Sequence, residues 1–314
     1  MKKRYVLAAA TAALALALTG CAPSGGSSGG GSGSKVIKIG FITKFPVDFY
    51  DTMVTAAKAW DAKETGAELV FSQGKSGTDD ESEINAIQAD ITLGVKAIAI
   101  TPTSPNVQGA LQKAVDAGIK VILIDNDIPK WDGKSAVVAT DNLAGGKLAG
   151  AFLAKTLKPG AKIAVLQGVL GNPSLDDRVT GMIDGLGSGF TIVSKTPTDC
   201  DQTKGLNAGQ DVLTANPDLD AIYSACGPPI TGALQAVKAA GKEGKLVTVG
   251  FDASPDEVAA IAGGTETASV AQFPSKMGSL GAQTAFDAAK GKKVNANVDT
   301  GTAMVTKDNV SQFQ

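Results

Sequence analysis

The feature that most constrains the fold is an alternation of short apolar runs and longer amphipathic segments, which begins at residue 35. The runs are four to seven residues long and rich in Val and Ile, as in residues 36–42, 97–100 and 121–124. Continuous apolar runs of this kind are typical of parallel strands that helices cover on both faces. We therefore expect an α/β fold in which most strands are followed by a helix.

The number of predicted strands favours two lobes. Strands are expected at 36–42, 68–71, 97–100, 121–124, 162–166, 191–193, 221–224 and 246–249, with the first helices near 53–57, 82–93 and 107–117. One large sheet could hold all of these strands. The 280 residues that follow residue 34 suit two lobes of about five or six strands each better.

Loops at the carboxyl ends of parallel strands form the ligand crevice in sheets of this type. The corresponding segments are 43–50, 101–103, 125–127, 141–142, 168–178, 198–201, 225–229, 251–252 and 272–274. Aromatic rings, carboxylates, amides and one arginine gather in them. Any single Asp or Asn could instead cap the next helix, but the whole set favours a ligand cleft.

Composition narrows the kind of chemistry that is expected. The chain has no histidine and only three cysteines without a CxxC pair, which disfavours His-based catalytic arrangements, metal sites and cofactors. Without residues 1–20 the formal net charge changes from −2 to −5, which argues against nucleic acid. A glycosidase that uses Asp125 and Asp252 is the enzymatic alternative, but we expect no enzyme.

The first residues predict export. Basic residues 2–4 precede an apolar run of about 14 residues, shorter than the roughly 20 that span a bilayer. The end of this run, residues 18–21, resembles the lipobox of bacterial lipoproteins. The resemblance implies a signal peptide at 1–20, lipidation of Cys21 and a Gly/Ser tether at 21–34. The protein is then extracytoplasmic and held at the cell membrane by its lipid alone, unless Cys21 follows an ordinary signal peptide by chance.

Several segments of the body carry a further resemblance. They are 121–125, 141–147, 166–168, 178–181, 204–207, 249–252 and 271–272. In this order they resemble the type I periplasmic binding proteins, in the ribose-binding branch that serves ABC importers. The resemblance implies two Rossmann-like lobes with parallel sheets, joined by three crossings. One lobe is expected at 35–141 plus 273–300, the other at 142–272 plus 301–314.

The resemblance also implies a set of ligand-binding residues. Phe49 and Tyr50 supply an aromatic platform for the apolar face of a sugar. The polar residues of the cleft are Asp48, Asp125, Asn126, Arg178, Asp252 and Gln272, with Asp141 ranked lower because a hinge crossing is the better place for it. Carboxylates, amides and a guanidinium can each bind hydroxyl groups.

Departures from the ribose-binding pattern bear on the ligand. Asn126 stands where that pattern has an arginine, Val47 where it has an asparagine, and Cys200 where it has an aromatic residue. Cys226 and Gly227 replace its Asn-Asp. These losses favour a smaller or open-chain polyol, or another pentose, over ribose. The two cysteines align with facing cleft positions, so we expect a Cys200–Cys226 disulfide, with two free buried thiols as the alternative.

Together these features predict a monomeric, lipid-anchored solute-binding protein of an ABC importer. It captures a small carbohydrate, a pentose or a sugar alcohol, by hinge closure and delivers it to permease subunits. The alternative is a sensor that presents its ligand to a membrane receptor. Trp131 either reaches over the mouth of the cleft or lies on the surface.

Overall fold

The computed structural model describes residues 36–313. The expected signal peptide, the lipidated Cys21 and the tether lie outside these residues. Within them, no helix is both long and apolar enough to cross a membrane.

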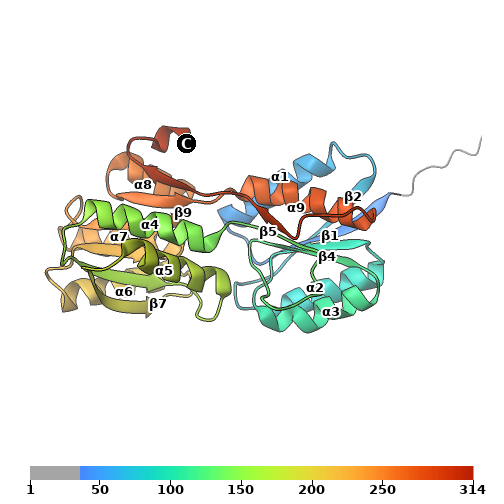
Figure 1. Cartoon of the computed structure of the whole chain (residues 1–314), viewed down its shortest axis with the longest axis horizontal. Helices are drawn as coiled ribbons and strands as arrows, with labels where there is room; N and C mark the ends of the chain where they lie inside the picture. The colour runs from blue at the N-terminus through green and yellow to red at the C-terminus, as the bar shows by residue number, and fades with distance from the viewer. Residues whose placement is uncertain (1–35, 314) are drawn as a thin grey trace, which may run out of the picture. The chain divides into compact units, whose positions relative to one another are not determined.

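The first lobe is built on a six-stranded sheet in which all neighbouring strands are parallel, in the order β11-β5-β4-β3-β1-β2. Its strands are β1 (Ile37–Thr43), β2 (Ala67–Gln73), β3 (Ala97–Ile100), β4 (Lys120–Ile124), β5 (Ala136–Ala139) and β11 (Asn297–Asp299). Figure 1 shows α1 (Asp48–Asp61) and α9 (Pro274–Ala289) on one face, and α2 (Asp80–Leu93) and α3 (Gln108–Asp116) on the other. A short 3-10 helix, η1 (Pro105–Val107), leads into α3.

The second lobe repeats this plan with a sheet in the order β12-β10-β9-β8-β6-β7. Its strands are β6 (Lys162–Gln167), β7 (Thr191–Pro197), β8 (Ala221–Ser224), β9 (Val247–Asp252), β10 (Ala268–Ala271) and β12 (Ala303–Thr306). Its helices are α4 (Asn142–Thr156), α5 (Pro173–Leu186), α6 (Gln202–Ala215), α7 (Gly227–Ala239) and α8 (Pro255–Gly263), and η2 (Val310–Gln312) ends the described chain.

Alternating side chains of the central strands build a core on each face of each sheet. In β6, Ile163 and Val165 pack with α4 and α5, while Ala164 and Leu166 pack with α6 and α7. All four side chains are buried. Burial on both faces explains why these strands are continuous apolar runs in the sequence.

The chain passes between the sheets after β5, after β10 and after β11. The third passage gives β12, which pairs antiparallel with β10 and is an exception to the expected parallel sheets. It enters this sheet directly from β11, which belongs to the sheet of the other lobe. The lobe boundaries expected from the sequence stay a prediction.

Close packing of α4 against α5 positions the single arginine of the cleft. A Cβ on Gly146 would lie 2.3 Å from the carbonyl oxygen of Arg178, and one on Gly181 would lie 2.2 Å from that of Leu143. Only glycine lets the two backbones approach this closely. The glycines of these two helices therefore determine the position of the Arg178 backbone, and with it the reach of the Arg178 side chain.

Candidate ligand-binding site

A cavity of about 800 Å³ lies between the two lobes, at the loops that follow the strands. Its volume is in the range of small-molecule sites. Eight of the nine residues expected to bind a ligand line it, namely Asp48, Phe49, Tyr50, Asp125, Asn126, Arg178, Asp252 and Gln272. The structure thus brings residues together that are more than 200 positions apart in the sequence.

Three aromatic rings form one wall. The ring of Tyr50 meets that of Phe49 edge to face at 5.3 Å and that of Phe45 at 5.4 Å. The Tyr50 hydroxyl donates a hydrogen bond of 3.1 Å to Asp125 Oδ2. Because its hydroxyl is bound to a carboxylate, Tyr50 is held in place, and the rings offer an apolar surface for the C–H face of a ligand.

Asp125 directly follows β4 and is buried. Its Oδ2 accepts hydrogen bonds from the Tyr50 hydroxyl and, at 2.6 Å, from Asn126 Nδ2. Its Oδ1 accepts none from the residues that the structure describes. One oxygen therefore fixes the carboxylate, and the other is left for a donor in the cavity.

Asp252, at the end of β9, has both oxygens occupied by the protein. Oδ1 accepts hydrogen bonds from Arg178 Nη1 at 3.2 Å and from Gln272 Nε2 at 2.6 Å, and Oδ2 accepts one from the Gly227 amide at 3.0 Å. Burial raises the pKa of Asp252, while the Arg178 cation opposes that rise. Asp252 is therefore a residue that positions Arg178 and Gln272.

Every part of the Arg178 guanidinium except Nη2 is in contact with the protein. Nε donates to Asn142 Oδ1 at 2.8 Å, Nη1 donates to the Ala225 carbonyl at 2.9 Å, and the guanidinium lies 4.0 Å from the centre of the Phe251 ring. Nη2 donates to no group in the described part of the chain. Its two N–H groups are thus free for an acceptor in the cavity.

The lobes touch beside the cavity. Asn172 Nδ2, from the second lobe, donates to Asn126 Oδ1 of the first at 3.0 Å. Ser174 Oγ donates to the Asp125 carbonyl oxygen at 3.4 Å. Residues of both lobes therefore surround a bound ligand in this arrangement.

A disulfide joins Cys200 to Cys226 on the second-lobe wall of the cavity, with their Cα atoms 5.8 Å apart. Cys200 lies in the turn before α6, and Cys226 precedes α7. The bridge connects the starts of these two helices.

Strained backbone is concentrated around the cavity. Six non-glycine residues in the described range have positive φ, and five of them line it. They are Asp125 (65°), Asp199 (51°), Cys200 (54°), Asp252 (103°) and Ala253 (48°). Strain of this kind costs on the order of 1–3 kcal/mol per residue and clusters at functional sites. This supports the cavity as the functional site on grounds independent of residue type.

Two expectations need correction. Asp141 does not line the cavity. It lies where the chain passes between the lobes after β5, which the sequence ranked as the better place for it, and its exposed carboxylate accepts a hydrogen bond from the Ala144 amide as the N-cap of α4. The capping alternative thus describes this residue. Trp131 is buried in the first-lobe core, where its indole donates to Gln112 Oε1 at 2.9 Å, so it lies neither over the cleft nor on the surface.

Three of the cavity residues that were not predicted individually bear on the function. Lys44 and Phe45 follow β1, and Asn172 caps α5 while it contacts the other lobe. All three lie in segments that were expected to form the crevice, 43–50 and 168–178. For Lys44, the available signal was a lysine directly after a buried strand.

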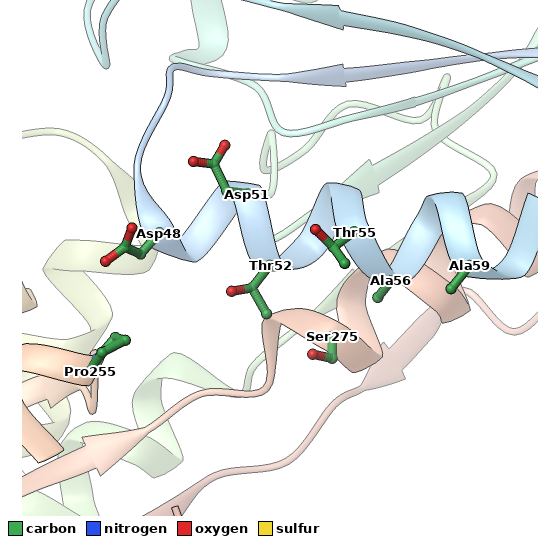
Figure 2. A pocket seen from close by; sticks show the side chains of 8 residues that line it. All are labelled: Asp48, Asp51, Thr52, Thr55, Ala56, Ala59, Pro255 and Ser275. Carbon is green, nitrogen blue, oxygen red and sulfur yellow. The ribbon is translucent and has the colours of Figure 1, made fainter. Parts of the chain in front are cut away.

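A second hollow of about 530 Å³ runs along the exposed side of α1 (Figure 2). Six of its eight lining residues come from α1, and Ser275 and Pro255 complete it. Its side chains are small, and of the expected ligand residues it contains only Asp48. The larger cavity is therefore the better candidate. Over residues 36–313, no group of three or more Asp, Glu, Cys or His side chains could hold a metal ion.

Comparison with known proteins places this geometry in a family. A family model described as a periplasmic binding protein domain matches residues 39–293. The ribose import binding protein of Salmonella typhimurium is 38% identical over 221 residues, which cover 69% of this chain and 74% of that protein.

Two crystal structures of ABC transporter solute-binding proteins are similar throughout the body. One, from Mycobacterium smegmatis with bound glycerol, is 33% identical, with a TM-score of 0.82 over 88% of this chain and 96% of that one. The other, from Agrobacterium vitis with bound D-fucose, is 32% identical, with a TM-score of 0.83 over 88% and 97%. The chain belongs to the periplasmic binding protein family, in the type I, ribose-binding group.

Proposed function

We propose that the protein captures a small neutral carbohydrate or polyol, a pentose or a sugar alcohol, and delivers it to the permease of an ABC importer. The observation that carries this proposal is the cavity between the lobes, where an aromatic wall faces free hydrogen-bonding atoms of Asp125 and Arg178. Relatives named for ribose or allose binding support the ligand class. Membership of this family confirms the prediction of a binding protein rather than an enzyme.

Capture depends on contacts that the ligand makes with both lobes only when the lobes approach each other. A ligand in the cavity meets Tyr50 and Asp125 from one lobe and Arg178 from the other. Only the arrangement in which the lobes approach each other makes all of these contacts, so the ligand favours it over the open arrangement.

Export and anchoring belong to the same proposal. The lipobox-like residues before Cys21 support an extracytoplasmic protein that its lipid holds at the membrane. Metabolic labelling with a radioactive fatty acid should label the wild type and leave Cys21→Ser unlabelled. Equal labelling of both proteins would refute the anchor.

A thermal-shift panel tests ligand capture. The purified protein is screened against pentoses, hexoses and sugar alcohols, with amino acids as a control class. A ligand present at 100 times its dissociation constant should stabilise the fold by about 2.7 kcal/mol. No response to any carbohydrate or polyol would contradict the proposed ligand class.

A further inference from the structure

Lys44 is a buried cation in the wall of the cavity. It directly follows β1, and its backbone amide is fixed by a hydrogen bond of 3.1 Å to Thr101 Oγ1. The residue is 6% exposed and lines the cavity. A lysine at this depth calls for an acceptor, because an unpaired buried charge is costly.

No acceptor of the described chain contacts the Lys44 ammonium. The Lys44 ammonium makes neither a hydrogen bond nor an ion pair with residues 36–313, although Asp125 and Glu83 are near enough to raise its pKa against the larger lowering by burial. Glu83 Oε2 is occupied by the Thr103 amide and hydroxyl, at 2.8 and 2.9 Å. Glu83 Oε1 is buried without a hydrogen-bond partner and forms no ion pair with Lys44. The three N–H groups of the ammonium are therefore free for a ligand.

Lys44 lines the same cavity as a free acceptor of the same lobe. Asp125 Oδ1 has no donor among the described residues, and Asp125 has the largest electrostatic effect of any charged group on Lys44. A hydroxyl group can accept a hydrogen bond from an ammonium and donate one to a carboxylate. A ligand carboxylate or phosphate can do only the first and is repelled by Asp125.

The buried charges of the cavity also balance. The buried Lys44 and Arg178 are opposed by the buried Asp125 and the partly buried Asp252, while the other charged residues of the lining are exposed. A neutral ligand keeps this balance, whereas an anion would add an unopposed charge in a place where solvent screens poorly.

We propose that Lys44 is a specificity-determining residue, whose ammonium donates to a hydroxyl of a neutral ligand while Asp125 accepts from that hydroxyl. The inference rests on the proposed carbohydrate function and adds two points. Lys44 and Asp125 of the first lobe together recognise one hydroxyl group of the ligand. The same two residues exclude sugar acids and sugar phosphates of the same carbon skeleton.

The test combines a variant with altered ligands. Isothermal titration calorimetry compares wild type, Lys44→Met and the control Lys63→Met, which removes an exposed lysine of the same lobe. The probes are D-ribose, D-arabinose, D-xylose, ribitol, xylitol and arabinitol, with the deoxy analogues and aldonates of whichever binds. Lys44→Met should bind the best neutral probe about tenfold or more weakly than wild type does, as expected for the loss of a hydrogen bond to a charged group. Lys63→Met should bind that probe with the affinity of wild type.

Two further results distinguish a direct contact between Lys44 and the ligand from a purely structural role of Lys44. One deoxy analogue should bind the wild type more weakly than its parent does, and this difference should be smaller for Lys44→Met, in which the hydroxyl donates to Asp125 alone. The unliganded variant should melt at a temperature equal to or above that of wild type, because a buried unpaired charge is gone. A lower melting temperature would contradict the unpaired state of Lys44.

Other outcomes overturn different claims. Lys44→Met binding within about twofold of wild type, or an aldonate binding as tightly as its neutral parent, would refute the role of Lys44 while leaving carbohydrate capture intact. Binding of no probe by the wild type would refute the proposed function and the role of Lys44 in it, while the melting comparison would still test the unpaired ammonium.

Discussion

At the scale of single residues, Asp252 acts through its neighbours. Both of its oxygens are filled by Arg178, Gln272 and the Gly227 amide, so it has little left to offer a ligand. From the sequence alone, Asp252→Ala is expected to abolish binding and leave the fold intact. The structure changes that expectation, because alanine would leave Arg178 buried without its counter-charge.

We predict that Asp252→Ala loses about 3–5 kcal/mol of stability, as when one partner of a buried ion pair is removed. Asp252→Asn keeps the shape and one acceptor oxygen, and should lose less stability. Urea unfolding of both variants gives the comparison, and calorimetry on Asp252→Asn then reports binding separately from folding. Wild-type stability in Asp252→Ala would contradict the positioning role.

A second residue-scale prediction concerns pH. Glu266 is buried and close to Glu257, with both carboxyls directed at Gly250. Burial, and then the Glu257 charge, raise the pKa of Glu266 well above its usual value. The folded protein thus holds a proton that the unfolded chain releases, so the stabilisation is complete at acidic pH and is lost as pH rises towards the raised pKa.

Melting temperatures from about pH 5 to about pH 9 measure this effect. Wild type should lose stability across the range, and Glu266→Gln should lose less of it. The exposed Glu243→Gln serves as control and should follow wild type. Equal slopes for wild type and Glu266→Gln would show that Glu266 does not hold the proton.

At the scale of elements, the apolar runs predict the buried strands well, because most side chains of a strand covered on both faces are apolar. The short strands β5, β10, β11 and β12 were not predicted. Strand β11 has only three residues, and Asn297 and Asp299 in it are exposed, so hydrophobic periodicity carries no signal there. Their pairing is decided by the neighbouring strands, which a local pattern does not contain.

The candidate site was predictable to a similar degree. Residues expected where strong strands end, such as Asp125 and Asp252, line the cavity, and their part in ligand binding stays a prediction. The sequence could not reveal that Asp252 is saturated by protein donors or that Lys44 lacks one. Both facts depend on atoms from distant segments meeting in space.

The disulfide acts at the scale of elements because it connects two helices. It links residues 26 positions apart and ties the start of α6 to that of α7. A closed loop of this length stabilises a fold by about 3 kcal/mol through the entropy of the unfolded chain. We predict that a reductant lowers the melting temperature of wild type and weakens ligand binding, because the second-lobe wall loses its link.

The control is the double variant Cys200→Ser/Cys226→Ser. It should melt below oxidised wild type and show no response to reductant. Mass spectrometry after alkylation without reductant should find neither cysteine labelled in wild type. Two labelled thiols would refute the bridge.

At the scale of the whole molecule, function depends on the balance between separated and touching lobes. Asn172 is well placed to bias this balance because its side chain has two separate tasks. Its Oδ1 caps α5 by accepting from the Leu175 amide, and its Nδ2 donates across the cleft to Asn126. Asn172→Asp keeps the cap and removes the cross-lobe donor, and it adds a negative charge on the side of the cleft that faces Asp125.

We predict that Asn172→Asp shifts the unliganded protein towards separated lobes and weakens ligand binding about two- to tenfold, the range of one modest hydrogen bond. Small-angle scattering should give a larger radius of gyration than wild type without ligand and an equal one at saturation. Asn172→Ser, which also retains a capping oxygen but adds no charge, separates loss of the contact from repulsion. If both variants match wild type in scattering and affinity, the contact between Asn172 and Asn126 does not contribute to closure, and the ligand alone brings the lobes together.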